Sequence, residues 1–282
     1  MVAGGTDALL VLSYNVCWEA MSHRDSLPLG RLCTFVPGAP HLTRCAVNVS
    51  QCIDAMPDAL GMDGFDFIGL QEASNWYEWR AYAPRTLLRM AAVHSESRHE
   101  LMVSYYDDGR YDLSHEPVCG NVGGGRPFQI LVCAARQGGG GVIFINIHAG
   151  HHQDFGFLAG ALGAAAAPLP LTAAEKAYRI IVVGDFNEAD WNWHARRLNV
   201  TSWQPLAAAG IAAAVQVGTT PFTCCKSDGN WQAPGGGLAT GDRAGDYVFD
   251  SVAPTACQIP PNYLPGSLQS DHLPVLAVLP GA

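Results

Sequence analysis

Short apolar segments, rich in β-branched residues, alternate with turns and helical stretches along the whole chain. Each has the length of a β-strand, and several are apolar on both faces, which is typical of strands in a sheet that is covered on each side. The pattern predicts strands at Leu9–Asn15, Asp66–Gln71, Leu101–Tyr106, Phe128–Ala134, Val142–His148, Arg179–Gly184, Tyr247–Ser251 and Pro274–Leu279.

Between these strands, helical spacing and loop composition predict the connecting elements. The glycine run at Gln137–Gly141 favours a hairpin between two of the strands, and it lacks the Lys and Ser/Thr of a phosphate-binding P-loop. Long surface loops, which often carry function, are predicted at Ser22–Pro40 and Lys226–Gly245. Helices are predicted at Thr43–Met56, Trp76–Val93, Phe157–Ala167 and Trp191–Leu198, with a short helix beginning in Thr172–Ala177.

Strands and helices interleave to the end of the chain without a Pro/Ser linker, a charge run or a repeat. A chain of 282 residues, 49% of them hydrophobic, can bury a large core, and we expect one domain over 1–282. No stretch approaches the ~20 apolar residues of a membrane span. Met1–Asp7 has no basic region before the first apolar run, and the nine cysteines form no regular framework. These features predict an intracellular protein, in the cytoplasm or nucleus, with free thiols.

The charge balance restricts the class of partner. The net charge is −9, and the chain has two lysines, Lys176 and Lys226, beside fourteen arginines. Proteins that hold long nucleic acids usually carry a basic face, so the balance argues against a tight binder of long duplex DNA. It does not argue against a small phosphoester substrate.

Polar side chains suited to cation or phosphate chemistry follow strand after strand. Asp185 and Asn187 in Gly184–Asn187 could alone be an Asx-turn that closes a strand. However, Glu and His, which are not preferred turn residues, occur in equivalent places. The set at the strand ends comprises Asn15, Gln71, Glu72, Asn146, His148, Asp185, Asn187, Asp246, Asp271 and His272.

In this ordered set the chain resembles the endonuclease/exonuclease/phosphatase superfamily, the DNase I-like proteins. That family is marked by an Asn after the first strand, Leu-Gln-Glu, Thr/Asn-x-His, Gly-Asp-Phe-Asn, an Asp near the last strands and Ser-Asp-His, and all six motifs occur here in that order, from Asn15 to His272. The resemblance implies an α/β fold, a four-layer α-β-β-α sandwich of two packed mixed β-sheets flanked by helices. The site is then expected in the cleft at one end.

The resemblance also implies a role for each residue. Glu72 is the expected principal ligand of Mg²⁺ or Mn²⁺, assisted by Asn15 and Asp271, since hard oxygen ligands suit these ions. The catalytic group comprises Asp185, to orient or deprotonate the attacking water; Asn187, to hold water or a phosphoryl oxygen; His148, to contact a non-bridging oxygen; and His272, oriented by Asp246, to handle a proton or a phosphate oxygen. Whether Asp185 or His272 is the general base stays open.

Four further residues are weaker candidates for substrate binding. Glu19 follows the first-strand motif and could face the cleft. His151, in a short histidine cluster, is either a second metal or phosphate contact or part of a polar rim loop. Lys226 and Arg243 belong to the loop that precedes Asp246 and could overhang the site.

The expected activity is hydrolysis of a phosphodiester by in-line attack of water, with an intracellular nuclease or nucleotide-directed phosphodiesterase as the leading interpretation. Short or single-stranded nucleic acid is favoured over a long duplex, and we expect a monomer without membrane contact. A phosphatase for a small phosphorylated metabolite, such as an inositol phosphate, is the alternative. A binding protein that has lost the chemistry is a third reading.

Overall fold

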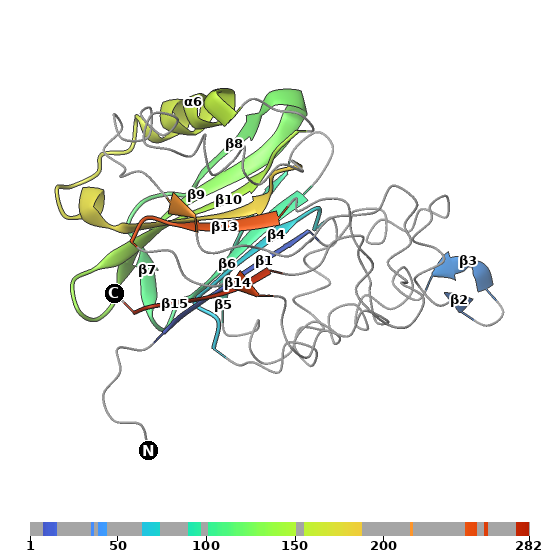
Figure 1. Cartoon of the computed structure of the whole chain (residues 1–282), viewed down its shortest axis with the longest axis horizontal. Helices are drawn as coiled ribbons and strands as arrows, with labels where there is room; N and C mark the ends of the chain where they lie inside the picture. Colours follow the sequence, from blue (N-terminus) through green and yellow to red (C-terminus); the bar gives the residue numbers. More distant parts are fainter. Residues whose placement is uncertain are drawn as a thin grey trace, which may run out of the picture.

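The structure is a computed structural model, and it describes residues 8–15, 35–36, 39–43, 64–73, 90–96, 101–150, 155–187, 215–216, 246–252, 257–258 and 275–281. Two β-sheets make up most of this part of the chain (Figure 1). A separate two-stranded ribbon pairs β2 (Phe35–Val36) with β3 (Ala39–Thr43). No helix in these ranges is both long and apolar enough to span a membrane.

The first sheet has six strands in the order β14-β15-β1-β4-β6-β5. Its central pair, β1 and β4, is parallel, and the other neighbours are antiparallel, so the sheet is mixed. The strands are β1 (Leu9–Asn15), β4 (Phe67–Gln71), β5 (Met90–Glu96), β6 (Leu101–Asp107), β14 (Cys257–Gln258) and β15 (Val275–Leu279).

The second sheet has seven strands in the order β12-β13-β11-β10-β9-β7, with β8 also paired to β9. Here β10 and β11 are parallel, while β9 and β10 form the predicted hairpin across the glycine run. The strands are β7 (Tyr111–Leu113), β8 (Val118–Val122), β9 (Arg126–Ala135), β10 (Gly141–His148), β11 (Arg179–Asp185), β12 (Val215–Gln216) and β13 (Asp246–Asp250). A 3₁₀ turn, η2 (Gly123–Gly125), joins β8 to β9.

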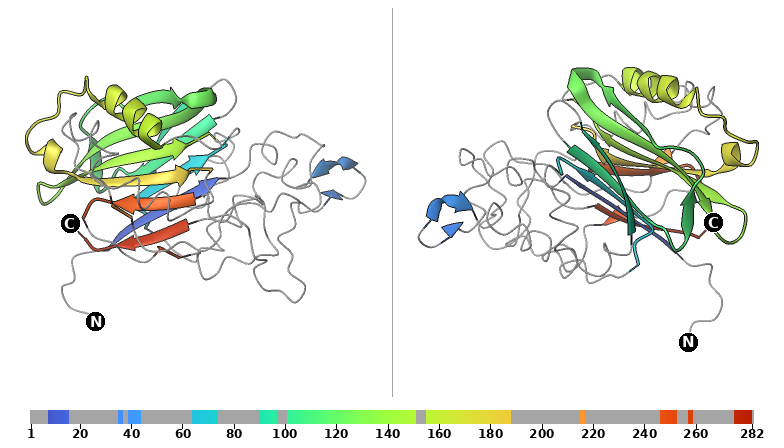
Figure 2. Two further views of the ribbon diagram at one scale, coloured as in Figure 1. Left: turned by 45° about the horizontal axis from the view of Figure 1, so that its top comes forward. Right: turned by 180° about the vertical axis from the view of Figure 1, so that it is seen from behind.

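The two sheets pack face to face (Figure 2). Apolar side chains fill the space between them. The rings of Phe67 on β4 and Phe144 on β10 stack across this interface with centroids 5.0 Å apart. Helix α6 (Phe155–Ala166) covers the outer face of the seven-stranded sheet, where Leu158 and Leu162 are buried against β9, β10 and β11. Strands covered on both sides are therefore apolar on both faces, as the sequence pattern indicated.

The structure confirms the predicted sandwich of two packed mixed sheets. Every predicted strand is present with ends that differ by at most a few residues, and α6 matches the helix predicted at Phe157–Ala167. The short helix expected within Thr172–Ala177 is the 3₁₀ turn η3 (Glu175–Ala177). The helix expected at Trp191–Leu198 lies outside the described residues.

Two helix predictions are wrong where the structure describes them. Met90–Val93, expected to end a helix, lies in β5, and Thr43, expected to begin one, is the last residue of β3. Ala91 and Ala92 favour a helix locally, but backbone pairing with β6 outweighs this weak preference. The loop expected at Ser22–Pro40 likewise contains β2 and the start of β3.

Strand register brings the ends of the central strands together. In the six-stranded sheet Asn15 of β1 lies beside Gln71 of β4. In the other sheet His148 of β10 lies beside Asp185 of β11, which in turn lies opposite Asp246 of β13. Because the carboxyl ends of parallel strands meet at one edge of a sheet, both sheets present these polar residues at the same end of the sandwich.

Candidate active site

Asn15 and Asp185 connect the two sheets at this end of the sandwich. The Asn15 carboxamide Nδ2 donates a hydrogen bond of 2.9 Å to Asp185 Oδ2, and both residues are 1% exposed. An amide that holds a buried carboxylate in one orientation removes part of the cost of burying its charge. Asp185 is therefore fixed in place rather than free to rotate.

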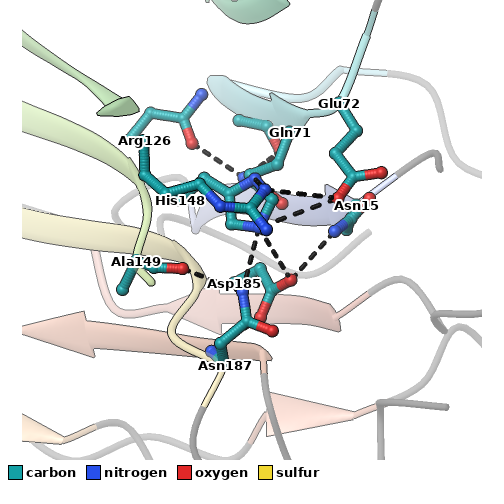
Figure 3. Close-up of polar contacts among 10 residues, drawn as sticks. Asn15, Gln71, Glu72, Arg126, His148, Ala149, Asp185 and Asn187 are labelled. Atoms are coloured by element: carbon teal, nitrogen blue, oxygen red, sulfur yellow. Dashed lines mark hydrogen bonds and ion pairs between the residues drawn. The ribbon is translucent and has the colours of Figure 1, made fainter. Parts of the chain in front are cut away.

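His148 lies between the side chains of Glu72 and Asp185. Its Nε2 is 3.4 Å from Asp185 Oδ2 and 3.7 Å from Glu72 Oε1. Figure 3 shows Asn15, Glu72, Arg126 and Asp185 around the imidazole. The His148 side chain is buried, whereas that of Glu72 is 12% exposed and can reach a ligand from solvent.

The Gly184–Asn187 segment is both an Asx-turn and part of the site. The backbone N–H of Asn187 donates to Asp185 Oδ1 at 2.8 Å, which closes the turn. Asn187 lies beyond β11 and has a φ of 51°. Its side chain therefore does not follow the alternation of side chains along a strand. Its Nδ2 instead donates to the Ala149 carbonyl at 2.8 Å and lies 3.0 Å from His148 Nε2.

Unusual backbone geometry gathers at this site. Among the described residues other than glycine, only Glu72 and Asn187 have positive φ, at 58° and 51°. Asn tolerates this conformation, but for Glu it is uncommon, and such strain costs about 1–3 kcal/mol. The strain turns Glu72 out of the line of β4 and towards His148. Strain of this kind persists where the surrounding structure fixes a functional conformation.

Gly184 is required for the close approach of β10 and β11. Its φ is 153°, and a Cβ at this position would lie 2.0 Å from the Ile147 carbonyl oxygen. A side chain would push the strands apart one residue before Asp185. The glycine of the motif therefore keeps Asp185 beside His148.

Arg126 is a site residue that the sequence reasoning missed. It is the first residue of β9, and its Nη1 lies 3.2 Å from His148 Nδ1 and 3.7 Å from Glu72 Oε1. The Arg126 side chain is 25% exposed, so it can also reach a bound anion. The predicted hairpin carries part of this signal, because Ile147 pairs with Phe128 and the start of β9 therefore lies beside the end of β10. Continuing that register would place Pro127, not Arg126, opposite His148, so the contact itself could not be predicted from the pairing.

Asn146, also predicted at a strand end, lies beneath the site rather than in it. Its Oδ1 accepts a 2.7 Å hydrogen bond from Gln71 Nε2, and its Nδ2 donates to the Val103 carbonyl at 3.1 Å. The network continues through Ser104 to Gln129. This buried polar chain ties the two sheets together below Glu72 and His148, so Asn146 and Gln71 support the site.

Asp246 is buried opposite Asp185 and shares its face of the sheet, since directly opposed residues of an antiparallel pair point the same way. The residues Glu19, His151, Lys226, Arg243, Asp271 and His272 lie outside the described part of the chain. Their roles, including the pairing of His272 with Asp246, stay predictions.

The donor set fits a hard divalent cation. Glu72, Asn15 and Asp185 offer carboxylate and amide oxygens, which Mg²⁺ and Mn²⁺ prefer. Within the described ranges no three His, Cys, Asp or Glu side chains form a closed chelate. Oxygen donors of this kind suit Mg²⁺, which usually keeps several waters and takes one or two carboxylates.

Comparisons with known proteins agree with this architecture. No protein-family model matches the sequence. An uncharacterised protein of Acanthamoeba polyphaga mimivirus, L684, is 29% identical over 189 residues; the match covers 63% of this chain and 34% of the viral protein, so the chain spans about a third of that relative.

Solved structures share the fold at low sequence identity. An endonuclease/exonuclease/phosphatase from Bacteroides vulgatus aligns with a TM-score of 0.53 at 15% identity, covering 96% of this chain and 97% of that one. Danio rerio TDP2, solved with a single-stranded DNA product, aligns with a TM-score of 0.55 at 13% identity, covering 95% and 97%. The chain therefore has the fold of these proteins, which confirms the fold that the motifs implied.

Proposed function

We propose that the chain is a divalent-metal-dependent phosphoesterase that cleaves a phosphodiester by in-line attack of water. The observation that carries the proposal is the convergence of Asn15, Glu72, His148 and Asp185, from both sheets, at one end of the sandwich. Arg126 adds a cation at the same place. Acidic, amide and basic side chains in mutual contact, on strained backbone, are costly for folding alone and suit phosphoryl chemistry.

The chemistry must overcome the negative charge of the substrate. Glu72 and Asp185 would repel a phosphoester, and Arg126 offsets only part of that charge. Glu72 and Asn15, with the predicted Asp271, would hold Mg²⁺ or Mn²⁺. Bound there, the ion would supply positive charge that stabilises the phosphoryl oxygens and the leaving group.

The protein's own side chains would carry the remaining steps. Asp185 is oriented by Asn15 and by the Asn187 backbone, so one carboxylate can align or deprotonate the attacking water. His148 and Arg126 would donate hydrogen bonds to phosphoryl oxygens as charge develops on them. The predicted pair of Asp246 and His272 would handle a proton.

The proposed substrate is a nucleotide or a short single strand rather than a long duplex. The net charge of −9 disfavours the extended phosphate contacts on which duplex binding depends. The structural likeness to TDP2 with a single-stranded DNA product supports the same class. The substrate class, the intracellular location and the monomeric state are part of the proposal.

The test is a Mg²⁺/Mn²⁺ activity screen over single-stranded DNA, RNA, dinucleotides, inositol phosphates and a generic phosphodiester. Glu72→Ala is the inactive variant, and Glu116→Ala, which removes an exposed carboxylate, is the matched control. We expect metal-dependent turnover of a phosphodiester by the parent chain and by Glu116→Ala, and loss in Glu72→Ala. Equal activity in Glu72→Ala would show that the hydrolysis arises elsewhere, and turnover of monoesters alone would overturn the substrate assignment.

A further inference from the structure

We infer that Arg126 is a positioning residue that fixes the tautomer of His148, holding the imidazole hydrogen on Nε2. The inference deepens the proposed function, on which its catalytic consequence rests, but the tautomer itself can be measured in the protein without metal or substrate. The argument starts from the two sides of the imidazole ring, which meet different kinds of neighbour.

On one side, Nδ1 faces a group that can only donate. Arg126 Nη1 lies 3.2 Å from His148 Nδ1, and a guanidinium carries donors only and keeps its proton. A hydrogen on Nδ1 would point at another hydrogen. The contact is favourable only if Nδ1 accepts, which leaves the hydrogen of the neutral ring on Nε2.

On the other side, Nε2 lies near two carboxylates, which can only accept, and near the Asn187 amide, which donates. Asp185 Oδ2 is 3.4 Å away and Glu72 Oε1 is 3.7 Å away. The His148 side chain is 1% exposed, so bulk water competes poorly for its ring nitrogens. The negative charge of both carboxylates favours a hydrogen on Nε2, which is the same tautomer that Arg126 favours at Nδ1.

The Asn187 side chain favours the other tautomer. Its Nδ2 lies 3.0 Å from His148 Nε2, and the carboxamide orientation is set because the same Nδ2 donates to the Ala149 carbonyl at 2.8 Å. The amide favours an unprotonated Nε2. A hydrogen bond from a charged donor is roughly twice as strong as one from a neutral donor, so Arg126 outweighs Asn187. Without the guanidinium, the Asn187 amide would shift the balance towards a hydrogen on Nδ1.

The tautomer matters because Nε2 points to the space between Glu72 and Asp185 (Figure 3). With its hydrogen there, His148 can donate to a phosphoryl oxygen. With the hydrogen on Nδ1, the ring would present a lone pair to that anionic oxygen and repel it. Arg126 therefore acts on the reaction through His148, in addition to any charge it offers the substrate.

The direct test is NMR of protein labelled with ¹⁵N-histidine, without metal or substrate, with the His148 signals assigned from His148→Gln. In the parent chain we expect an unprotonated Nδ1 and a protonated Nε2. Arg126→Met should move the signals towards the other tautomer, whereas Arg136→Met, which removes an exposed guanidinium elsewhere, should leave them unchanged. A protonated Nδ1 in the parent chain, or unchanged His148 signals in Arg126→Met, would overturn the inference.

A double-mutant cycle tests the catalytic consequence. Glutamine at position 148 offers an N–H near the place of Nε2 whatever Arg126 does. We expect Arg126→Met to lower kcat on the order of 10²-fold in the parent chain, as for loss of one transition-state donor, but much less in the His148→Gln background. Equal factors in both backgrounds would show that Arg126 acts on the substrate alone and would overturn the catalytic part. If the parent chain shows no phosphoesterase activity, the proposed function fails while the NMR result still decides the tautomer.

Discussion

Gly69 allows the two sheets to approach directly beneath the candidate site. It lies in the middle of β4, and a Cβ built there would be 2.4 Å from Val183 Cγ2 on β11 and 2.9 Å from the Asn146 carboxamide on β10. Both distances are well inside van der Waals contact. Gly69→Ala therefore inserts one methyl group into a packed interface between sheets.

The cost follows from overpacking. An extra methyl group in a well-packed core typically destabilises a protein by about 1–3 kcal/mol, because side chains leave their rotamers and the backbone shifts. The shift would occur between Asn146 and Glu72, which is only three residues away along the chain. We therefore expect Gly69→Ala to lower the free energy of unfolding by this amount and also to reduce activity.

Urea denaturation at equilibrium measures the effect, with the m-value as a check that the compactness of the unfolded state is unchanged. Gly160→Ala is the matched control, because Gly160 is helical and a Cβ there meets nothing within 4 Å. This control should gain about 0.5–1 kcal/mol, since alanine is the better helix former. The substitution of glycine by alanine should therefore lower the free energy of unfolding at position 69 and raise it at position 160.

A second substitution tests the mechanism. Val183→Ala removes the methyl group that the new Cβ would meet, at a cost on the order of 2 kcal/mol from lost burial and the cavity left behind. The double variant Gly69→Ala/Val183→Ala should lose clearly less stability than the sum of the two single variants, although the new Cβ still lies 2.9 Å from the Asn146 carboxamide. Additive losses in the double variant, or a stability of Gly69→Ala equal to that of the parent, would refute the packing argument.

Two further predictions concern buried charges away from the site. Arg179→Met should lower the free energy of unfolding in urea by about 3–5 kcal/mol, because it leaves the buried Asp250 carboxylate without the guanidinium that donates to both its oxygens at 2.6 Å. Burial tends to raise the pKa of Glu175, but hydrogen bonds from Thr172 and the nearby His115 bring the pKa below its usual value. The stability that this carboxylate contributes is present above its unfolded pKa and is lost as pH falls through its folded pKa, so Glu175→Gln should lose less stability than the parent chain on acidification.

Each of these predictions has a clear contrary result. A stability of Arg179→Met within about 1 kcal/mol of the parent, the range of an exposed pair, would mean that the Asp250 carboxylate is not isolated by the substitution. If the free energy of unfolding fell equally with decreasing pH in Glu175→Gln and in the parent chain, Glu175 would have the same pKa in the folded and unfolded protein.

The sequence predicts the central strands better than the edges. β1, β10 and β11 are apolar on both faces because they are covered on both sides, and this pattern is readable without a structure. β5 contains good helix formers and the exposed His94, and it becomes a strand only through pairing with β6. Only residues 97–100 separate β5 from β6, but Met90–Val93 lacks the alternation of apolar and polar residues that marks a strand, so local pattern predicts a helix there.

The candidate site shows the same division. Asn15, Glu72, His148 and Asp185 each follow or end a buried strand, and this shared position revealed them. Arg126 begins a strand, so it lacks the position at a strand end that the other site residues share. The positive φ of Glu72 depends on what surrounds it and could not be predicted from sequence.

In the proposed function, Asp185, which is held by Asn15 and lies next to His148, acts on the attacking water in metal-dependent phosphodiester hydrolysis. The most direct measurement is the rate of hydrolysis of a generic phosphodiester with saturating Mn²⁺, for the parent chain and for Asp185→Asn, which keeps the shape and removes the charge. We predict a loss of at least about 10³-fold with unchanged circular dichroism. Equal rates in the two proteins would show that the Asp185 carboxylate takes no part in the reaction.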